Sequence, residues 1–203
     1  MPQASLPCTQ QCLLIGGSTS DLLKARFGIQ DRSLALITHP DTTSETALSE
    51  LFSNSSPVRH SQGHTLFLEC FANDVILARH SSPSLDDQLR NFSLLCYYLS
   101  TSRPFKRVVL IDLWPAVLKS DSLAGFTAQI ARERNLIAAA LSSVVEFEAI
   151  ELGRDSSSLA NPADLFNLSA QGLDSLEACL RQRLPSSSVY HHGWSVSARL
   201  SDE

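Results

Sequence analysis

Short apolar segments of strand length alternate with segments of helical periodicity along most of this chain, and that alternation constrains its fold most strongly. Arg107–Leu113 is the most apolar of the short segments, which is typical of a strand covered on both faces. Strands are expected at Gln11–Gly16, Ser33–Thr38, His64–Cys70, Val75–Arg79, Arg107–Leu113 and Val144–Leu152, with an edge strand at Val189–Leu200. Helices are expected over Ser18–Phe27 and Thr43–Phe52, from a Ser84/Asp87 capping box to Pro104, from Ser120–Ser122 through Leu141, and from Asp174 to Pro185, with a short turn at Asn161-Pro162.

This order predicts an α/β protein with three layers, in which helices cover both faces of a mainly parallel sheet. Val75–Arg79 is expected to pair with His64–Cys70 as a hairpin that turns at Asn73-Asp74. Neither an internal repeat nor a long linker divides the chain. We therefore expect an N-terminal tail over residues 1–10 and a single domain over residues 11–203.

The composition narrows the function classes. Of the 203 residues, 43% are hydrophobic and 18% charged, which allows a buried core and argues against disorder. A formal charge of −5 disfavours binding to nucleic acid, which needs a dense basic surface. No apolar run is long enough to cross a membrane, and Met1–Gln11 lacks the pattern of a secretory signal. Five cysteines, an odd number, do not indicate a disulfide framework, so a cytoplasmic location is expected.

The segment Gly16-Gly17-Ser18-Thr19-Ser20 joins the first expected strand to the first expected helix. Proteins that bind nucleoside triphosphates place a phosphate loop of the form GxxxxGK[ST] at this position, where lysine contacts the phosphates and Ser/Thr holds magnesium. Here no glycine-lysine pair follows at the required offset, and the nearest lysine is Lys24. The segment is therefore a degenerate phosphate-loop position, and neither a cofactor nor a bound metal is expected.

Two aspartates occupy further positions used by nucleotide-binding domains. Asp112 ends the apolar strand, where a magnesium-binding carboxylate would stand, although a simple cap of the turn also explains it. Asp155, in Gly153-Arg154-Asp155, is the one remnant of an [NT]KxD base-reading motif. The stretch Leu168–Asp174 is similar to the Ser-Ala loop and helix that end small GTPase domains.

Taken together, these positions resemble the cytoplasmic GTPase-like domain of the TssM/IcmF family, the inner-membrane subunit of type VI secretion. Leu14–Leu23 is similar to the family's "LVIGPPGSGKTTLL" without its GK, and Phe71–Arg79 is similar to "FTDEAVLIDTAGR" without its switch residues. The resemblance covers residues 11–155 and implies a P-loop GTPase-like topology. It implies a non-catalytic interaction module with no catalytic residue, which binds protein partners of a secretion or envelope complex and is recruited to the inner membrane without inserting.

Two enzymatic alternatives stay open. In a serine hydrolase on a parallel sheet, Ser18 or Ser20 would be the nucleophile and His191 or His192 the base, although neither GxSxG nor the Asp-x-x-His pair of the lipase-like fold is present. In a weak nucleotide hydrolase, Asp112 would hold the metal.

The remaining histidines are ambiguous. His60 and His64 are four residues apart in a serine- and glycine-containing loop, where a metal pair or a solvated loop is possible. The sequence does not assign a role to His191, His192 and Trp194.

Overall fold

A five-stranded parallel sheet forms the centre of the molecule. The structure, a computed structural model, describes residues 12–27, 34–53, 55–80, 84–161 and 163–184. The strands are β1 (Cys12–Gly16), β2 (Leu34–Thr38), β3 (Thr65–Glu69), β4 (Arg107–Leu113) and β5 (Glu146–Leu152). They pair in the order β2-β1-β3-β4-β5, and every pair is parallel. All five carboxyl ends therefore lie along one edge of the sheet.

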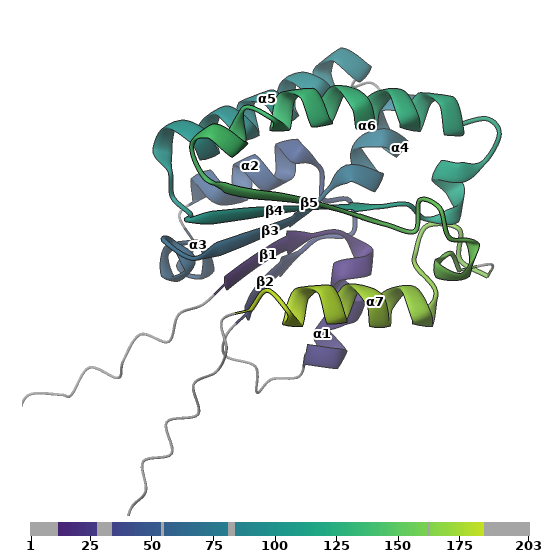
Figure 1. The fold of residues 1–203 in the computed structure, drawn as a ribbon, viewed down its shortest axis with the longest axis horizontal. Helices are drawn as coiled ribbons and strands as arrows, with labels where there is room; N and C mark the ends of the chain where they lie inside the picture. The colour runs from purple at the N-terminus through teal and green to yellow at the C-terminus, as the bar shows by residue number, and fades with distance from the viewer. Residues whose placement is uncertain (1–11, 28–33, 54, 81–83, 162, 185–203) are drawn as a thin grey trace, which may run out of the picture.

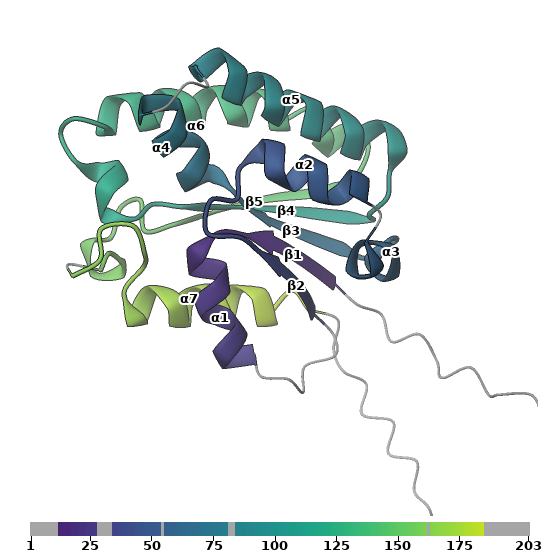
Figure 2. The ribbon, with the colours of Figure 1, turned by 180° about the vertical axis from the view of Figure 1, so that it is seen from behind.

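Helices cover both faces of this sheet (Figure 1). One layer contains α2 (Ser44–Ser53), α4 (Phe71–His80), α5 (Leu85–Ser102) and α6 (Ala124–Ala138). The other contains α1 (Ser18–Phe27) and α7 (Ala170–Arg181), which lie side by side in both views (Figure 2) and are linked by an ion pair from Arg26 to Asp174. The short helix α3 (Ser56–Ser61) precedes β3, and single turns of 3₁₀ helix occupy Ala116–Lys119, Leu141–Ser143 and Ser157–Leu159. The predicted three-layer α/β architecture is confirmed.

The core divides between the two faces because successive side chains of a strand point to opposite sides. The side chains of Leu13, Ile15 and Leu66 face the layer that contains α2 and α5. Those of Leu14 and Phe67 face α1 and α7. The central strands are buried on both faces, which explains why their sequences are continuously apolar rather than alternating. No helix among the described residues is long and apolar enough to cross a membrane.

Two expected elements are wrong. Val75–Arg79 is not a hairpin strand but part of α4, whose Phe71 and Val75 pack one helical turn apart on Trp114 and Ile130. A five-residue apolar run fits either a strand or a helix, and packing against α6 decided between them. Helix α7 begins at Ala170, with Ser169 as its N-cap through a hydrogen bond from Gly172 N, rather than at Asp174. The expected strand at Val189–Leu200 lies outside the described residues.

The strand order turns back on itself between β1 and β3. The crossover from β1 runs outward to β2, and the chain then returns to the other side of β1. In open parallel sheets of this order, ligands bind at the carboxyl ends of the two strands that flank this switch point. The segments that follow β1 and β3 therefore define the place to look for a site.

Candidate functional site

Ser18 lies at the switch point, as the first residue of α1, and Gly17 alone separates it from β1. Its hydroxyl donates a hydrogen bond to Oδ1 of Asn167, over 3.0 Å, and the Asn167 amide Nδ2 donates to Oδ2 of Asp164, over 2.7 Å. All three side chains are partly exposed. A hydroxyl, a planar polar group and a carboxylate thus form one chain of hydrogen bonds that opens to solvent.

The turn that carries Asn167 is fixed by Asp164. Its Oδ1 accepts a hydrogen bond from the backbone N–H of Phe166, over 3.0 Å, while its Oδ2 orients Asn167. These contacts, led by that from Asn167, hold the pKa of Asp164 below its usual range, so the carboxylate is ionised at neutral pH. A second hydroxyl, that of Thr19, also donates to Asn167 Oδ1, over 3.1 Å.

The hydrogen bonds from Ser18 through Asn167 to Asp164 have the order of a Ser-His-Asp triad, with an asparagine in the middle place. Asp164 and Asn167 have the spacing of the Asp-x-x-His pair, except that asparagine replaces histidine. In asparagine, as in histidine, a single carbon joins the two polar atoms of the side chain. The amide can therefore make the same two contacts as an imidazole. An amide oxygen accepts a hydrogen bond but is not an ionisable base, so Asn167 aligns Ser18 without the means to take its proton.

Ser20, the other proposed nucleophile, is fully buried, and its hydroxyl donates to Oε2 of Glu69, over 3.0 Å. The same oxygen accepts the backbone N–H of Gly17, over 2.7 Å. Burial raises the pKa of Glu69 to about 7 against the effect of these donors. Ser20 is therefore a structural contact beneath the turn, and Ser18 is the accessible hydroxyl.

Asn73, at the start of α4 after β3, is the polar side chain on the other flank. Its amide Nδ2 donates to the carbonyls of Pro40 and Thr42, over 3.2 and 3.0 Å, which uses both of its N–H groups. A Cβ placed on Gly17 would lie 2.9 Å from this nitrogen, so the amide is close to the Ser18 turn. Asn73 ties the loop after β2 to the site instead of presenting free donors there.

A buried ion cluster lies behind the site. Arg134 of α6 contacts Asp74 of α4 and, over 3.6 Å, Oδ1 of Asp112, while its guanidinium stacks on the ring of Phe92 at 3.9 Å. Burial raises the pKa of Asp112 to about 6, and the positive charge of Arg134 opposes that shift. Asp112, weighed above as a metal ligand, thus faces an arginine, and no cluster of three metal-ligating side chains occurs in the described part of the chain.

The other residues selected from the sequence are dispersed. Asp155 is exposed in the loop after β5, and His60 and His64 lie at the end of α3 and in the turn before β3. The C-terminal His191, His192 and Trp194 lie outside the described residues.

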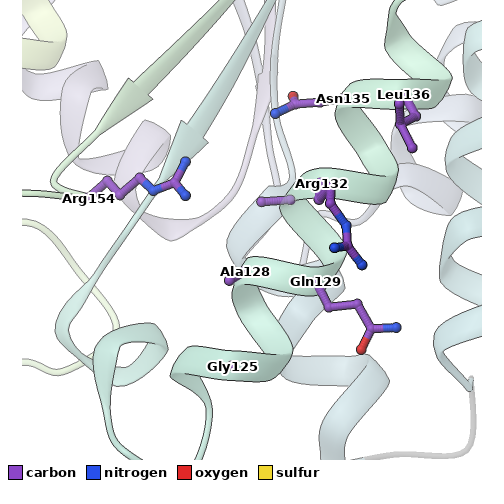
Figure 3. Close-up of a pocket in the computed structure, with 8 residues that line it drawn as sticks. Gly125, Ala128, Gln129, Arg132, Asn135, Leu136 and Arg154 are labelled. Atoms are coloured by element: carbon purple, nitrogen blue, oxygen red, sulfur yellow. The ribbon is translucent and has the colours of Figure 1, made fainter.

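A hollow of about 730 Å³ lies over α6, and no residue of the Ser18 site lines it. Figure 3 shows Arg154 reaching toward the middle of α6, whereas Gln129 and Arg132 point away from Arg154. The cationic groups of this hollow therefore do not converge on one point.

The sequence matches no known family model and no curated protein. Solved structures do match in fold. A GDSL-like lipase from Bacteroides thetaiotaomicron aligns with a TM-score of 0.61 at 14% identity, over 89% of this chain and 90% of that one. A putative acylhydrolase from Bacteroides fragilis aligns with a TM-score of 0.60 at 18% identity, over 85% of each chain. A catalytic serine-to-alanine mutant of an acetylxylan esterase from Geobacillus stearothermophilus aligns with a TM-score of 0.59 at 15% identity, over 85% of this chain and 93% of that one.

The fold is therefore that of GDSL-like lipases and acylhydrolases. The predicted resemblance to the TssM/IcmF GTPase-like domain is wrong, and with it the P-loop topology and the pseudo-GTPase role in type VI secretion. The order of the motifs is similar because a strand, a glycine turn and a helix open both kinds of domain. The segment Phe71–Arg79, matched there to a switch hairpin, is helix α4.

Sequence reasoning missed Asn167, Asp164, Asn73 and Glu69. One signal is present in the sequence: Asp164-Leu165-Phe166-Asn167 precedes the last described helix with the spacing of an Asp-x-x-His pair, but with asparagine in place of the histidine. Glu69 and Asn73 carry no local signal, since their roles depend on the return of β3 beside β1.

Proposed function

We propose that this chain is a slow acyl-ester hydrolase with Ser18 as its nucleophile. The observation that carries the proposal is the hydrogen-bond chain from Ser18 through Asn167 to Asp164 at the switch point of the sheet. The fold shared with lipases, acylhydrolases and an acetylxylan esterase supports an ester as the substrate class. The catalytic mutant among them, a serine-to-alanine change, supports a serine as the attacking group.

The chemistry explains why turnover would be slow. Ser18 Oγ forms a bond to the carbonyl carbon of the ester, the C–O bond to the alcohol breaks, and water later releases the acid. Attack requires that the hydroxyl lose its proton, and the departing alcohol requires one. Asn167 supplies neither transfer, so the rate depends on how well Ser18 and the ester are aligned. Sites that lack a triad member keep roughly 10³- to 10⁴-fold acceleration over water.

The start of α1 supplies groups that would stabilise the oxyanion. The first N–H groups of a helix have no partner within it, so those of Ser18 and Thr19 are available to a carbonyl oxygen beside Ser18. The N–H of Gly17 is taken by Glu69, and the amide of Asn73 is taken by Pro40 and Thr42. Of these groups, only the N–H groups of Ser18 and Thr19 would then be left to bind the ester carbonyl, which further limits the rate.

The decisive experiment restores the base. Hydrolysis of 4-nitrophenyl acetate is measured for the wild type, Asn167→His, Ser18→Ala and the double variant. A histidine at 167 would have Asp164 on one side and Ser18 on the other, and a positioned base contributes roughly 10²- to 10⁴-fold. We expect Asn167→His to raise the rate at least about 100-fold over the wild type and Ser18→Ala to abolish the gain.

Imidazole alone cleaves activated esters, so a histidine elsewhere is the matched control. Asn135→His places one on the exposed face of α6, outside the Ser18 site, and should leave the rate at the wild-type level. An Asn167→His rate no higher than that of Asn135→His would overturn the proposal. So would a fast wild type that loses its activity in His191→Ala/His192→Ala, because its base would then come from the C-terminal residues.

A further inference from the structure

Glu69 places a buried carboxylate directly beneath the turn that presents Ser18. It is the last residue of β3 and pairs in register with Gly16 of β1, and it is only 3% exposed. Its Oε2 accepts the Gly17 N–H and the Ser20 hydroxyl, over 2.7 and 3.0 Å. These two donors stand on either side of Ser18 in the sequence, so a single oxygen fixes both ends of the reactive turn.

The two glycines before Ser18 make room for the side chains packed around this carboxylate. A Cβ on Gly16 would lie 2.2 Å from Ser20 Oγ and 3.1 Å from Glu69 Oε2, and a Cβ on Gly17 would lie 3.4 Å from the same carboxylate oxygen. The first of these distances is too short for any side chain. The absence of a Cβ at Gly16 thus leaves room chiefly for Ser20, and its absence at Gly17 leaves room for the amide of Asn73, 2.9 Å away, so both side chains can pack beside Glu69.

The charged surroundings of Glu69 are one-sided. Burial raises its pKa, the Gly17 and Ser20 donors lower it, and the negative charge of Asp112 on neighbouring β4 raises it. Behind Asp112 stand Arg134 of α6 and Asp74 of α4, both of which act on Asp112. The other elements contribute uncharged groups, namely Gly16 of β1, Ser20 of α1 and Asn73 of α4.

We propose that Glu69 is a positioning residue for Ser18: its ionised carboxylate holds the Gly17–Ser20 turn, and its protonation loosens that turn. The proposal rests on the function proposed above, since alignment matters only if Ser18 attacks a substrate. Hydrogen bonds to a charged acceptor are roughly twice as strong as those to a neutral one, so one proton weakens both contacts together. The Ser18 site would thus be better aligned in mildly alkaline than in mildly acidic solution.

The contact itself is tested by NMR on the wild-type protein, without any substrate. The Gly17 amide resonance should shift with pH through a transition near pH 7, and the transition should be absent in Glu69→Gln, which keeps the shape of the side chain. Asp112→Asn removes a like charge and should move the transition to lower pH. A Gly17 resonance that does not titrate, or that titrates identically in Glu69→Gln, would overturn the proposal.

The consequence for reactivity is tested in the Asn167→His background, where turnover is measurable. We expect Glu69→Gln to lower the rate about tenfold at pH 8 and to have little effect at pH 6, because Glu69 is then protonated anyway. At each pH the rate of Asn167→His is divided by that of Asn167→His/Glu69→Gln, and the titration of the new histidine cancels in this ratio. A ratio that stays constant with pH would reduce Glu69 to a structural role. If neither the wild type nor Asn167→His hydrolyses any ester, the proposed function fails. The Gly17 titration still decides whether Glu69 holds the turn.

Discussion

Replacing Arg134 with methionine should destabilise the fold by an amount that grows with pH. The Arg134 side chain is 3% exposed, contacts Asp74, and lies 3.6 Å from Asp112. Removing it leaves two carboxylates inside the protein without their cation, whereas methionine keeps much of the packing against Phe92. Breaking a buried ion pair on one side costs about 3 to 5 kcal/mol, and we expect this loss in the free energy of unfolding at pH 8.

The pH dependence follows from the two acids. Burial raises the pKa of both Asp74 and Asp112, and Arg134 opposes the rise. Without Arg134 both pKa values rise further, so the folded variant binds protons that the unfolded chain has already released. Its stability therefore falls more steeply with increasing pH than that of the wild type. At pH 5, below the raised pKa of Asp112 of about 6, we expect a smaller loss than at pH 8.

Urea unfolding followed by circular dichroism at pH 5 and pH 8 measures both quantities. Arg132→Met is the matched control, because Arg132 stands on the same helix with 72% of its side chain exposed, and its loss should stay within about 0.5 kcal/mol. Arg134→Met/Asp74→Asn should recover part of the stability by removing one stranded charge. An Arg134→Met loss below about 1 kcal/mol, or one equal at both pH values, would refute the reasoning.

Three further outcomes are expected from urea unfolding. Gly172→Ala should lower the free energy of unfolding by about 1 to 3 kcal/mol, because its Cβ would lie 2.7 Å from the Leu159 carbonyl oxygen. Gly125→Ala, whose Cβ would have nothing within 4 Å, should raise it by up to about 1 kcal/mol. Equal effects of the two variants would contradict this. Because the folded pKa of Glu69 is raised to about 7, its contribution to stability falls as pH rises from 4.5 to 7, by a total on the order of 3 kcal/mol, and Glu69→Gln should flatten that slope; an unchanged slope would contradict it. Ser84→Ala removes the cap of α5 and should cost about 1 kcal/mol, and no loss would show that the cap is dispensable.

Local periodicity was sufficient to predict most of the layers. The strand at Arg107–Leu113 and the capping box at Ser84 are confirmed because each depends on residues close together in the chain. The predicted strand at Val75–Arg79 is wrong, because a short apolar run contains no local information that separates a strand from a helix such as α4. The family resemblance failed for a related reason: a glycine turn between a strand and a helix suits a phosphate loop, but here it leaves room for Ser20 and Asn73.

The amino-acid sequence by itself determined the three-layer α/β architecture, because burial on one face of a helix or on both faces of a strand leaves a pattern within a few residues. Only the tertiary structure decided what surrounds Ser18. Asn167, its hydrogen-bond partner, is 149 residues away, and Glu69 is 49 residues from Ser20. Parallel strands bring such distant loops to the same edge of the sheet, and no spacing along the chain records which of them meet.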